Sequence, residues 1–241
     1  VVYEPMGVLL GVMPWNFPFW QVLRFAVPAI ALGNTIVMKH ASNVFGSSEA
    51  IEDAFLKAGF PEGVYQHAPL GSSQVGRLIA DHRVRGVSLT GSTEAGGSVG
   101  KLAGHHLKKA VLEVGGSDAY VILDDADLEL AAQKCVASRL INAGQSCVSA
   151  KRFIVTQKNS RIFSDLFVDK MKHKNFGDPR KPDSDICPLA RVDLRDELHG
   201  LVERAKKAGA NCVLGGKIPS ERGAFYPPTV LLDVDHDNPA F

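Results

Sequence analysis

Hydrophobic and polar positions along the chain follow two alternating patterns, short apolar runs and longer amphipathic stretches. Short apolar runs are typical of buried strands, and apolar positions that recur every three to four residues are typical of helices. Their regular alternation favours an α/β fold with a largely parallel sheet. Strands are predicted at 7–14, 34–39, 63–68, 85–92, 108–116, 119–125, 152–156 and 211–216. Helices are predicted at 20–33, 47–59, 73–82, 93–106, 126–141, 160–173 and 195–209.

Two local features modify this pattern. Pro28 falls inside the first predicted helix and is expected to kink or interrupt it, because proline lacks the backbone N–H that a helix needs. The pair Gly115-Gly116 separates two groups of elements and is the best candidate for a domain boundary. The sequence therefore predicts two domains, residues 1–115 and residues 116–241.

Composition narrows the class of protein. The chain is 45% hydrophobic and 22% charged, as expected for an ordinary globular protein. Its 27 basic and 26 acidic residues leave a net charge of +1, so nothing in the charge indicates nucleic acid or an anionic membrane as a partner. No signal-peptide or membrane-span pattern occurs. The four cysteines form no CxxC pair, which favours a cytoplasmic protein, and no residue spacing resembles a metal site.

Cys147 stands in the small and polar stretch NAGQSC, just before a predicted strand. A thiol attacks carbonyl carbons as the thiolate, so a catalytic cysteine needs an accessible and polar setting. The flexible Gly144 would also let the Cys147 backbone N–H face a developing oxyanion. A buried structural cysteine explains the same stretch, as it explains Cys135 within a predicted helix. The local pattern leaves both interpretations open.

Four other stretches have both a chemical and a structural interpretation. Glu113 ends an apolar strand, either as a general base that activates water or as a solvated strand end. Asn16 is an amide donor among aromatic residues that otherwise suit a core or an interface. Lys39 closes an apolar strand, where a cation meets ribose or phosphate or simply remains solvated. Gly91 and Ser92 form a turn before a helix whose N-terminus attracts phosphate, unless Ser92 serves only as the helix cap.

Together, the stretches PWNFPFW, MKHAS, TGSTEAG, LEVGG and NAGQSC occur in the order and spacing of the NAD(P)-dependent aldehyde dehydrogenases. The chain resembles this family over essentially all of its 241 residues. The resemblance implies a Rossmann-like dinucleotide-binding domain over 1–115 and an α/β catalytic domain over 116–241, which together form the aldehyde dehydrogenase fold. Relatives continue before Val1 and after Phe241, so both domains are expected to be incomplete and the chain an internal fragment.

The resemblance also implies roles for individual residues. Cys147 resembles the family's nucleophile, which forms a thiohemiacetal with the aldehyde and then a thioester. Asn16 and the Cys147 backbone N–H resemble the oxyanion donors, and Glu113 resembles the base that activates water. Lys39 resembles a residue that contacts the adenosine ribose. The other residues that the resemblance assigns to NAD or NADP are Pro14, Trp15, Ser42, Gly71, Ser72, Gly76, Gly91 and Ser92.

Three positions bear on the choice of cofactor and substrate. Ser42 stands three positions after Lys39, where NAD-specific relatives often carry a glutamate that repels the 2′-phosphate of NADP, so use of both cofactors is expected. Arg24 resembles the arginine that binds the substrate carboxylate in succinate-semialdehyde dehydrogenases. Ile141 stands where many of those enzymes carry a second arginine. Succinate semialdehyde is the expected substrate, and another aldehyde is the alternative.

Three classes of function remain after the sequence is considered alone. The first is a cytoplasmic homodimeric or homotetrameric enzyme that oxidises a small aldehyde with NAD or NADP and has no nucleic-acid or membrane partner. The second is a cofactor-independent cysteine esterase, which leaves Lys39 and the turn at Gly91 unexplained. The third is a folded fragment without catalytic activity.

Overall fold

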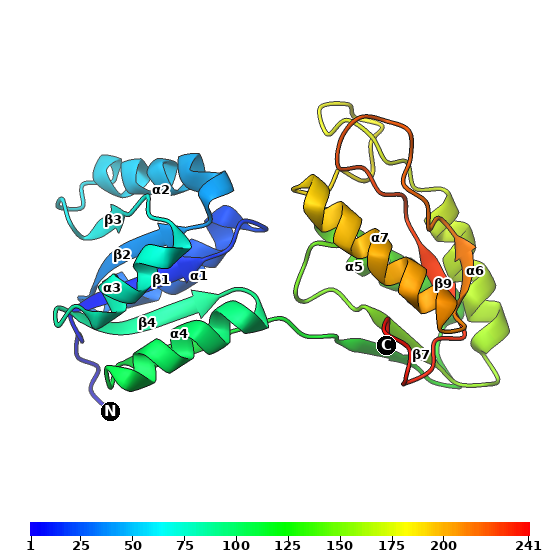
Figure 1. The fold of residues 1–241 in the computed structure, drawn as a ribbon, viewed down its shortest axis with the longest axis horizontal. Helices are drawn as coiled ribbons and strands as arrows, with labels where there is room; N and C mark the ends of the chain where they lie inside the picture. Colours follow the sequence, from blue (N-terminus) through cyan, green and yellow to red (C-terminus); the bar gives the residue numbers. More distant parts are fainter. The chain divides into compact units, whose positions relative to one another are not determined.

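The computed structural model describes residues 1–241, which divide into two compact units. Unit 1 comprises residues 1–115 and is coloured from blue to green in Figure 1, and unit 2 comprises residues 116–241 and is coloured from green to red. Unit 1 contains one sheet and two hydrophobic clusters, and unit 2 contains two sheets and one hydrophobic cluster. The predicted α/β fold with a largely parallel sheet is confirmed.

Unit 1 contains five strands, four α-helices and two short 3-10 helices. The strands are β1 (Val8–Met13), β2 (Thr35–His40), β3 (Tyr65–His67), β4 (Val84–Thr90) and β5 (Lys109–Glu113). The helices are α1 (Pro18–Ala31), α2 (Phe45–Lys57), α3 (Val75–Ala80), α4 (Thr93–His105), η1 (Ser42–Val44) and η2 (Ser72–Gln74). A kink or an interruption was predicted at Pro28, and the interruption is wrong, because α1 continues through this residue. Apolar residues before and after the proline, among them Val22 and Ile30, pack into one cluster and hold the helix together.

The sheet of unit 1 has the strand order β3-β2-β1-β4-β5, and every neighbouring pair is parallel. Residues from α1 and α2 form one hydrophobic cluster with the sheet, and residues from α3 and α4 form another. The chain passes from β1 to β2 on one side and returns to β4 on the other, so the strand order reverses between β1 and β4. In open parallel sheets, ligands bind outside the carboxyl ends of the strands at such a reversal.

Unit 2 is built around two small sheets. β6 (Ala119–Ile122) and β7 (Arg152–Val155) pair in parallel, and β8 (Asn211–Leu214) and β9 (Val230–Leu232) pair antiparallel. The helices are α5 (Leu128–Leu140), η3 (Ile141–Gly144), α6 (Ser160–Lys172) and α7 (Val192–Lys207). Side chains of α5 and α6 pack with both sheets in one hydrophobic cluster. The sequence pattern does not predict β9, because its three apolar residues directly follow a Pro-Pro-Thr stretch.

His40 connects the end of β2 to the loop that follows β1. The side chain is fully buried, and its Nε2 lies 3.1 Å from the backbone oxygen of Pro14. A carbonyl oxygen only accepts, so Nε2 carries the proton in the neutral ring. Burial, reinforced by the charges of His67 and Lys39, outweighs this hydrogen bond and lowers the pKa of His40 to about 4. His40 therefore holds the Pro14 carbonyl as a neutral imidazole at physiological pH.

This buried imidazole predicts a loss of stability as the pH falls from 6.5 toward 4. The unfolded chain takes up the proton near the ordinary pKa of 6.5, whereas folded His40 stays neutral until about pH 4, so stability is complete above this range and declines within it. Urea unfolding at several pH values should show a decline of up to about 3 kcal/mol from this group.

His40→Gln, which keeps an N–H donor but does not titrate, should flatten the pH profile of unit 1. The matched control is His105→Gln on the exposed surface of α4, which should leave the profile unchanged. An equal pH dependence in wild type and His40→Gln would show that the buried imidazole is not responsible.

Candidate functional site

The carboxyl ends of the parallel strands bring several predicted residues of unit 1 to one edge of the sheet. Asn16 lies in the loop after β1, Lys39 is the penultimate residue of β2, and Glu113 is the last residue of β5. Gly91 follows β4, and its backbone N–H donates to the Glu113 backbone oxygen at 3.0 Å. Residues from four separate stretches of the sequence thus share the edge at which parallel sheets bind ligands.

The N-terminus of α4 lies at the same edge. Ser92 caps this helix, because its Oγ accepts a hydrogen bond from the Ala95 backbone N–H at 3.2 Å. Gly96 in the second turn is buried, and a Cβ there would lie 2.5 Å from Cγ1 of Val114. The glycine therefore lets α4 approach the end of β5 closely. The free N–H groups and partial positive charge of a helix N-terminus favour phosphate.

The remaining cofactor candidates differ in position. Lys39 is half-buried, and burial lowers the pKa of its ammonium group. Ser42 is exposed at the start of η1, and no acidic residue occupies the first turn of that helix. Gly71 and Ser72 are exposed in the turn after β3. Gly76 is the second residue of α3, where a Cβ would make an ordinary contact of 3.6 Å with Leu102 of α4.

This donor set fits a nicotinamide dinucleotide. The capped helix N-terminus suits a pyrophosphate, and a half-buried lysine on the neighbouring strand suits ribose hydroxyl groups. Pro14 and Trp15 are half-buried in the loop after β1, where His40 holds the Pro14 carbonyl. The assignment of these residues and of Gly76 to the cofactor stays a prediction.

Arg24 lies beside Glu113. Its Nη2 is 3.7 Å from Oε2 of Glu113 and 3.4 Å from Oγ1 of Thr90. The two charged side chains are 37% and 57% exposed, so water screens the ion pair, and exposed pairs contribute only about 0–1 kcal/mol. A weak pair leaves both groups available for other partners. The assignments of Arg24 to the substrate and of Glu113 to water activation stay predictions.

Cys147 belongs to unit 2 and lies between η3 and β7. Cys147 and Cys187 are exposed, whereas Cys135 is buried within α5. Burial raises the pKa of the Cys135 thiol to about 11, which keeps that thiol protonated and unreactive. The structural interpretation considered for Cys147 requires burial, and the exposure of this residue removes that support.

The backbone ahead of Cys147 is strained. Asn142 and Ala143 have φ values of 51° and 54°, and Gly144 follows with 79°. The left-handed conformation costs a non-glycine residue about 1–2 kcal/mol, so two such residues in succession persist only where their surroundings hold them. Strain of this kind is concentrated at functional sites.

Side chains hold the loop around Cys147. Lys151 Nζ donates to the backbone oxygens of Cys147 at 3.2 Å and of Ser149 at 3.4 Å. The Gln145 side-chain oxygen accepts from the Ala190 backbone N–H at 2.9 Å, which ties the loop to the chain ahead of α7. The exposed thiol is therefore carried by a backbone with defined partners.

Sequence reasoning missed two residues that support these sites. His40 occupies the last of the alternating buried positions of β2, after Ile36 and Met38, and this alternation was a usable signal. Arg139 lies four residues after Cys135, on the buried side of α5, which is an unusual place for a guanidinium. A search for charged or titratable residues at positions where the apolar pattern predicts a buried side chain would have found both.

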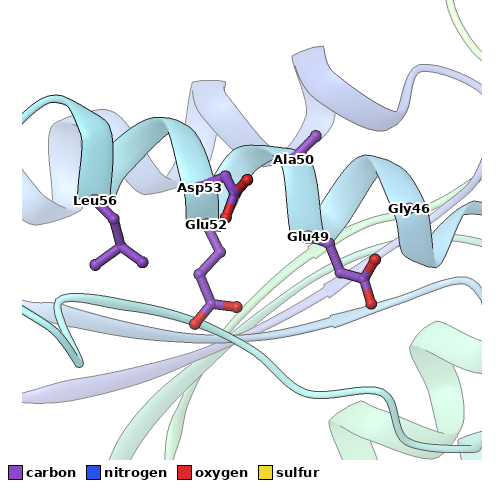
Figure 2. Close-up of a pocket in the computed structure, with 6 residues that line it drawn as sticks. All are labelled: Gly46, Glu49, Ala50, Glu52, Asp53 and Leu56. Atoms are coloured by element: carbon purple, nitrogen blue, oxygen red, sulfur yellow. The ribbon is translucent and has the colours of Figure 1, made fainter.

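A hollow along α2 contains none of the predicted residues (Figure 2). Figure 2 shows the carboxyl groups of Glu49 and Glu52 on the same side of the helix, and Glu52 accepts a hydrogen bond from the His67 backbone N–H at 3.0 Å. The residues that line the hollow are Gly46, Glu49, Ala50, Glu52, Asp53 and Leu56. Such an acidic surface disfavours phosphate. No cluster of His, Cys, Asp and Glu side chains is suited to a metal ion, and no helix combines the length and apolarity of a membrane span.

Comparison with known proteins identifies relatives along the whole chain. The succinate semialdehyde dehydrogenase [NAD(P)+] of Escherichia coli (strain K12) is 46% identical over 241 residues, which are 100% of this chain and 52% of that protein. The crystal structure of succinic semialdehyde dehydrogenase from Streptococcus pyogenes, in complex with NADP+, matches with a TM-score of 0.96 and 40% identity over 98% of this chain and 52% of that chain. Lactaldehyde dehydrogenase from Escherichia coli matches with a TM-score of 0.95 and 35% identity over 98% of this chain and 50% of that chain.

These matches confirm the predicted family resemblance and fold. The chain spans about half the length of the curated relatives it matches. The model of the aldehyde dehydrogenase family matches residues 1–241, so every element described above lies within the match. The chain therefore belongs to the aldehyde dehydrogenase family.

Proposed function

We propose that the protein carrying this chain oxidises an aldehyde to the carboxylic acid with NAD or NADP, and that the aldehyde is succinate semialdehyde. Family membership and the names of its relatives support the reaction class. The observation that carries the residue assignment is the exposure of Cys147 on a loop whose backbone oxygens are held by side-chain donors. An accessible thiol on a fixed backbone is what nucleophilic attack on a carbonyl requires.

Unit 2 is the proposed catalytic domain. The thiolate of Cys147 forms a bond to the aldehyde carbon, and the carbonyl oxygen becomes an oxyanion. The Cys147 backbone N–H donates to that oxyanion, as the resemblance implies. A bound nicotinamide would accept the hydride that leaves the aldehyde carbon. After oxidation Cys147 holds the acyl group as a thioester, which water cleaves to release the acid and the thiol.

Unit 1 is the proposed dinucleotide-binding domain. The N-terminus of α4 at Gly91 and Ser92 binds the pyrophosphate, and Lys39 binds the adenosine ribose. Asn16 donates its side-chain N–H to the oxyanion, and Glu113 takes the proton from the water that attacks the thioester. The weak and exposed pairing with Arg24 leaves the Glu113 carboxylate free to accept that proton.

The thiol assignment predicts that Cys147→Ser abolishes dehydrogenase activity. A hydroxyl is a far weaker nucleophile than a thiolate, so kcat of the intact protein should fall by more than about 10³-fold while the affinity for NADP is unchanged. Formation of NADPH from succinate semialdehyde measures the first quantity, and a binding titration measures the second. Cys187→Ser, the other exposed cysteine of unit 2, is the matched control and should retain activity.

Two results would contradict this assignment. Activity retained in Cys147→Ser would remove the thiol from the mechanism. Ester hydrolysis by the wild-type protein, without any aldehyde-dependent NADPH formation, would favour the cysteine esterase instead.

The neutral Ser42 predicts that NAD and NADP are both used. Their kcat/KM values should differ by less than about 10³-fold, because no carboxylate stands where it would repel a 2′-phosphate. Ser42→Glu should lower kcat/KM for NADP by more than about tenfold and leave the value for NAD nearly unchanged. Ser42→Gln is the neutral control of similar size. Equal effects of the two substitutions on both cofactors would exclude charge repulsion as the cause.

The substrate assignment predicts a selective effect of Arg24→Leu. Loss of the guanidinium should raise KM at least about tenfold more for succinate semialdehyde than for a neutral aliphatic aldehyde of equal length. Any effect through Glu113 applies to both aldehydes, so the ratio of the two KM changes isolates the carboxylate contact. Arg24→Lys keeps the positive charge but not the planar guanidinium, so its KM for succinate semialdehyde should lie between those of the wild type and Arg24→Leu. An equal KM change for both aldehydes would refute the assignment.

A further inference from the structure

Arg139 contacts the loop that carries Cys147 at both of its ends. It lies in the last turn of α5, and its Nη1 donates to the Ala150 backbone oxygen at 3.1 Å while its Nη2 donates to the Gly144 backbone oxygen. Gly144 stands three residues before Cys147 and Ala150 three residues after it. One planar group therefore binds the two carbonyls that bracket the thiol, and a charged donor makes both hydrogen bonds stronger than neutral ones.

The guanidinium lies in space that a glycine leaves open. A Cβ at Gly144 would be 2.4 Å from Nη2 of Arg139 and 3.2 Å from its Cζ, so any side chain at this position would displace the arginine. The positive φ of Gly144 is also one that glycine adopts without strain. The glycine at position 144 thus leaves the space that the Arg139 guanidinium occupies.

The hydrogen bonds of Arg139 lie next to the strained backbone. Asn142 and Ala143 adopt left-handed conformations directly before Gly144, whose carbonyl Arg139 holds. Lys151, which follows the loop in the sequence, donates to the backbone oxygens of Cys147 and Ser149. Arg139 is half-buried, so water competes little for its donors.

We propose that Arg139 is a positioning residue for Cys147, which holds the loop 144–150 and the left-handed turn before it in one conformation. The proposal rests on the proposed function, because only there is Cys147 the nucleophile. Arg139 touches no reacting atom and acts through the backbone. Its loss is expected to loosen the loop, while the apolar side chains of α5 and α6 keep their own packing.

Hydrogen exchange of the 241-residue chain, followed by mass spectrometry, tests this proposal. In Arg139→Ala, the amides of 142–151 should exchange at least about tenfold faster, and those of α6 should exchange at the wild-type rate. Arg139→Lys should recover part of the protection, because one ammonium group keeps the charge but binds one carbonyl at a time. Arg161→Ala, an exposed arginine on α6, is the matched control and should change neither region.

A second variant removes the contact without removing the arginine. Gly144→Ala should accelerate exchange over the same residues, which also covers the case in which Arg139→Ala does not fold. Unchanged exchange over 142–151 in either folded variant would overturn the proposal. Equal acceleration in the loop and in α6 would also overturn it, because Arg139 would then support unit 2 as a whole.

Kinetics of the intact protein separate positioning from the proposed function. In Arg139→Ala, kcat should fall at least about tenfold with KM for NADP unchanged, and millimolar guanidinium should restore part of kcat. A loosened loop with an unchanged kcat would overturn the positioning role. If Cys147→Ser retained activity, the proposed function would fail, whereas the exchange data would still decide whether Arg139 holds the loop.

Discussion

The parallel pairing of β1 with both β2 and β4 is the constraint on which the candidate site of unit 1 depends. It brings Asn16, Lys39 and Gly91 to one edge, although 75 residues separate the first from the last. The two faces of β1 pack in different clusters, with Leu10 in one and Met13 in the other. A shift of one residue would exchange these faces, so burial on both sides maintains the register that aligns the strand ends.

Unit 2 controls its key residue by a different means. Cys147 lies in a loop outside the regular hydrogen bonding of a sheet or an α-helix. The Lys151 side chain donates to the Cys147 backbone oxygen, and the Arg139 side chain donates to backbone oxygens on either side of it in the sequence. Such bonds offset the local cost of the left-handed residues ahead of the thiol. The exposed thiol of Cys147, the proposed nucleophile, thus lies on a loop held by a few polar contacts, while the hydrophobic cluster of α5 and α6 stabilises the unit.

The spacing of apolar residues, together with the glycine and proline positions between them, predicted most elements of the fold, because each strand and helix buries a repeating apolar face. The misses have physical reasons: α1 withstands Pro28 through packing on both sides, and β9 exists only through its pairing with β8. The candidate residues at strand ends could be predicted, since motifs mark them. The buried positions of His40 and Arg139 also carried a sequence signal, but their partners could not be predicted, because those backbone atoms are distant in sequence or lie in a turn whose conformation no local pattern specifies.

We propose that the carboxyl edge of the sheet in unit 1 binds a nicotinamide dinucleotide. Titration of the ¹⁵N-labelled chain with NADP+, followed through backbone amide chemical shifts, tests it most directly. The largest shifts should fall at Gly91, Ser92 and Thr93 at the start of α4 and at Lys39 at the end of β2. If the chemical shifts of these amides did not change at saturating NADP+, or if the shifts changed at the acidic hollow along α2 instead, dinucleotide binding at this edge would be refuted.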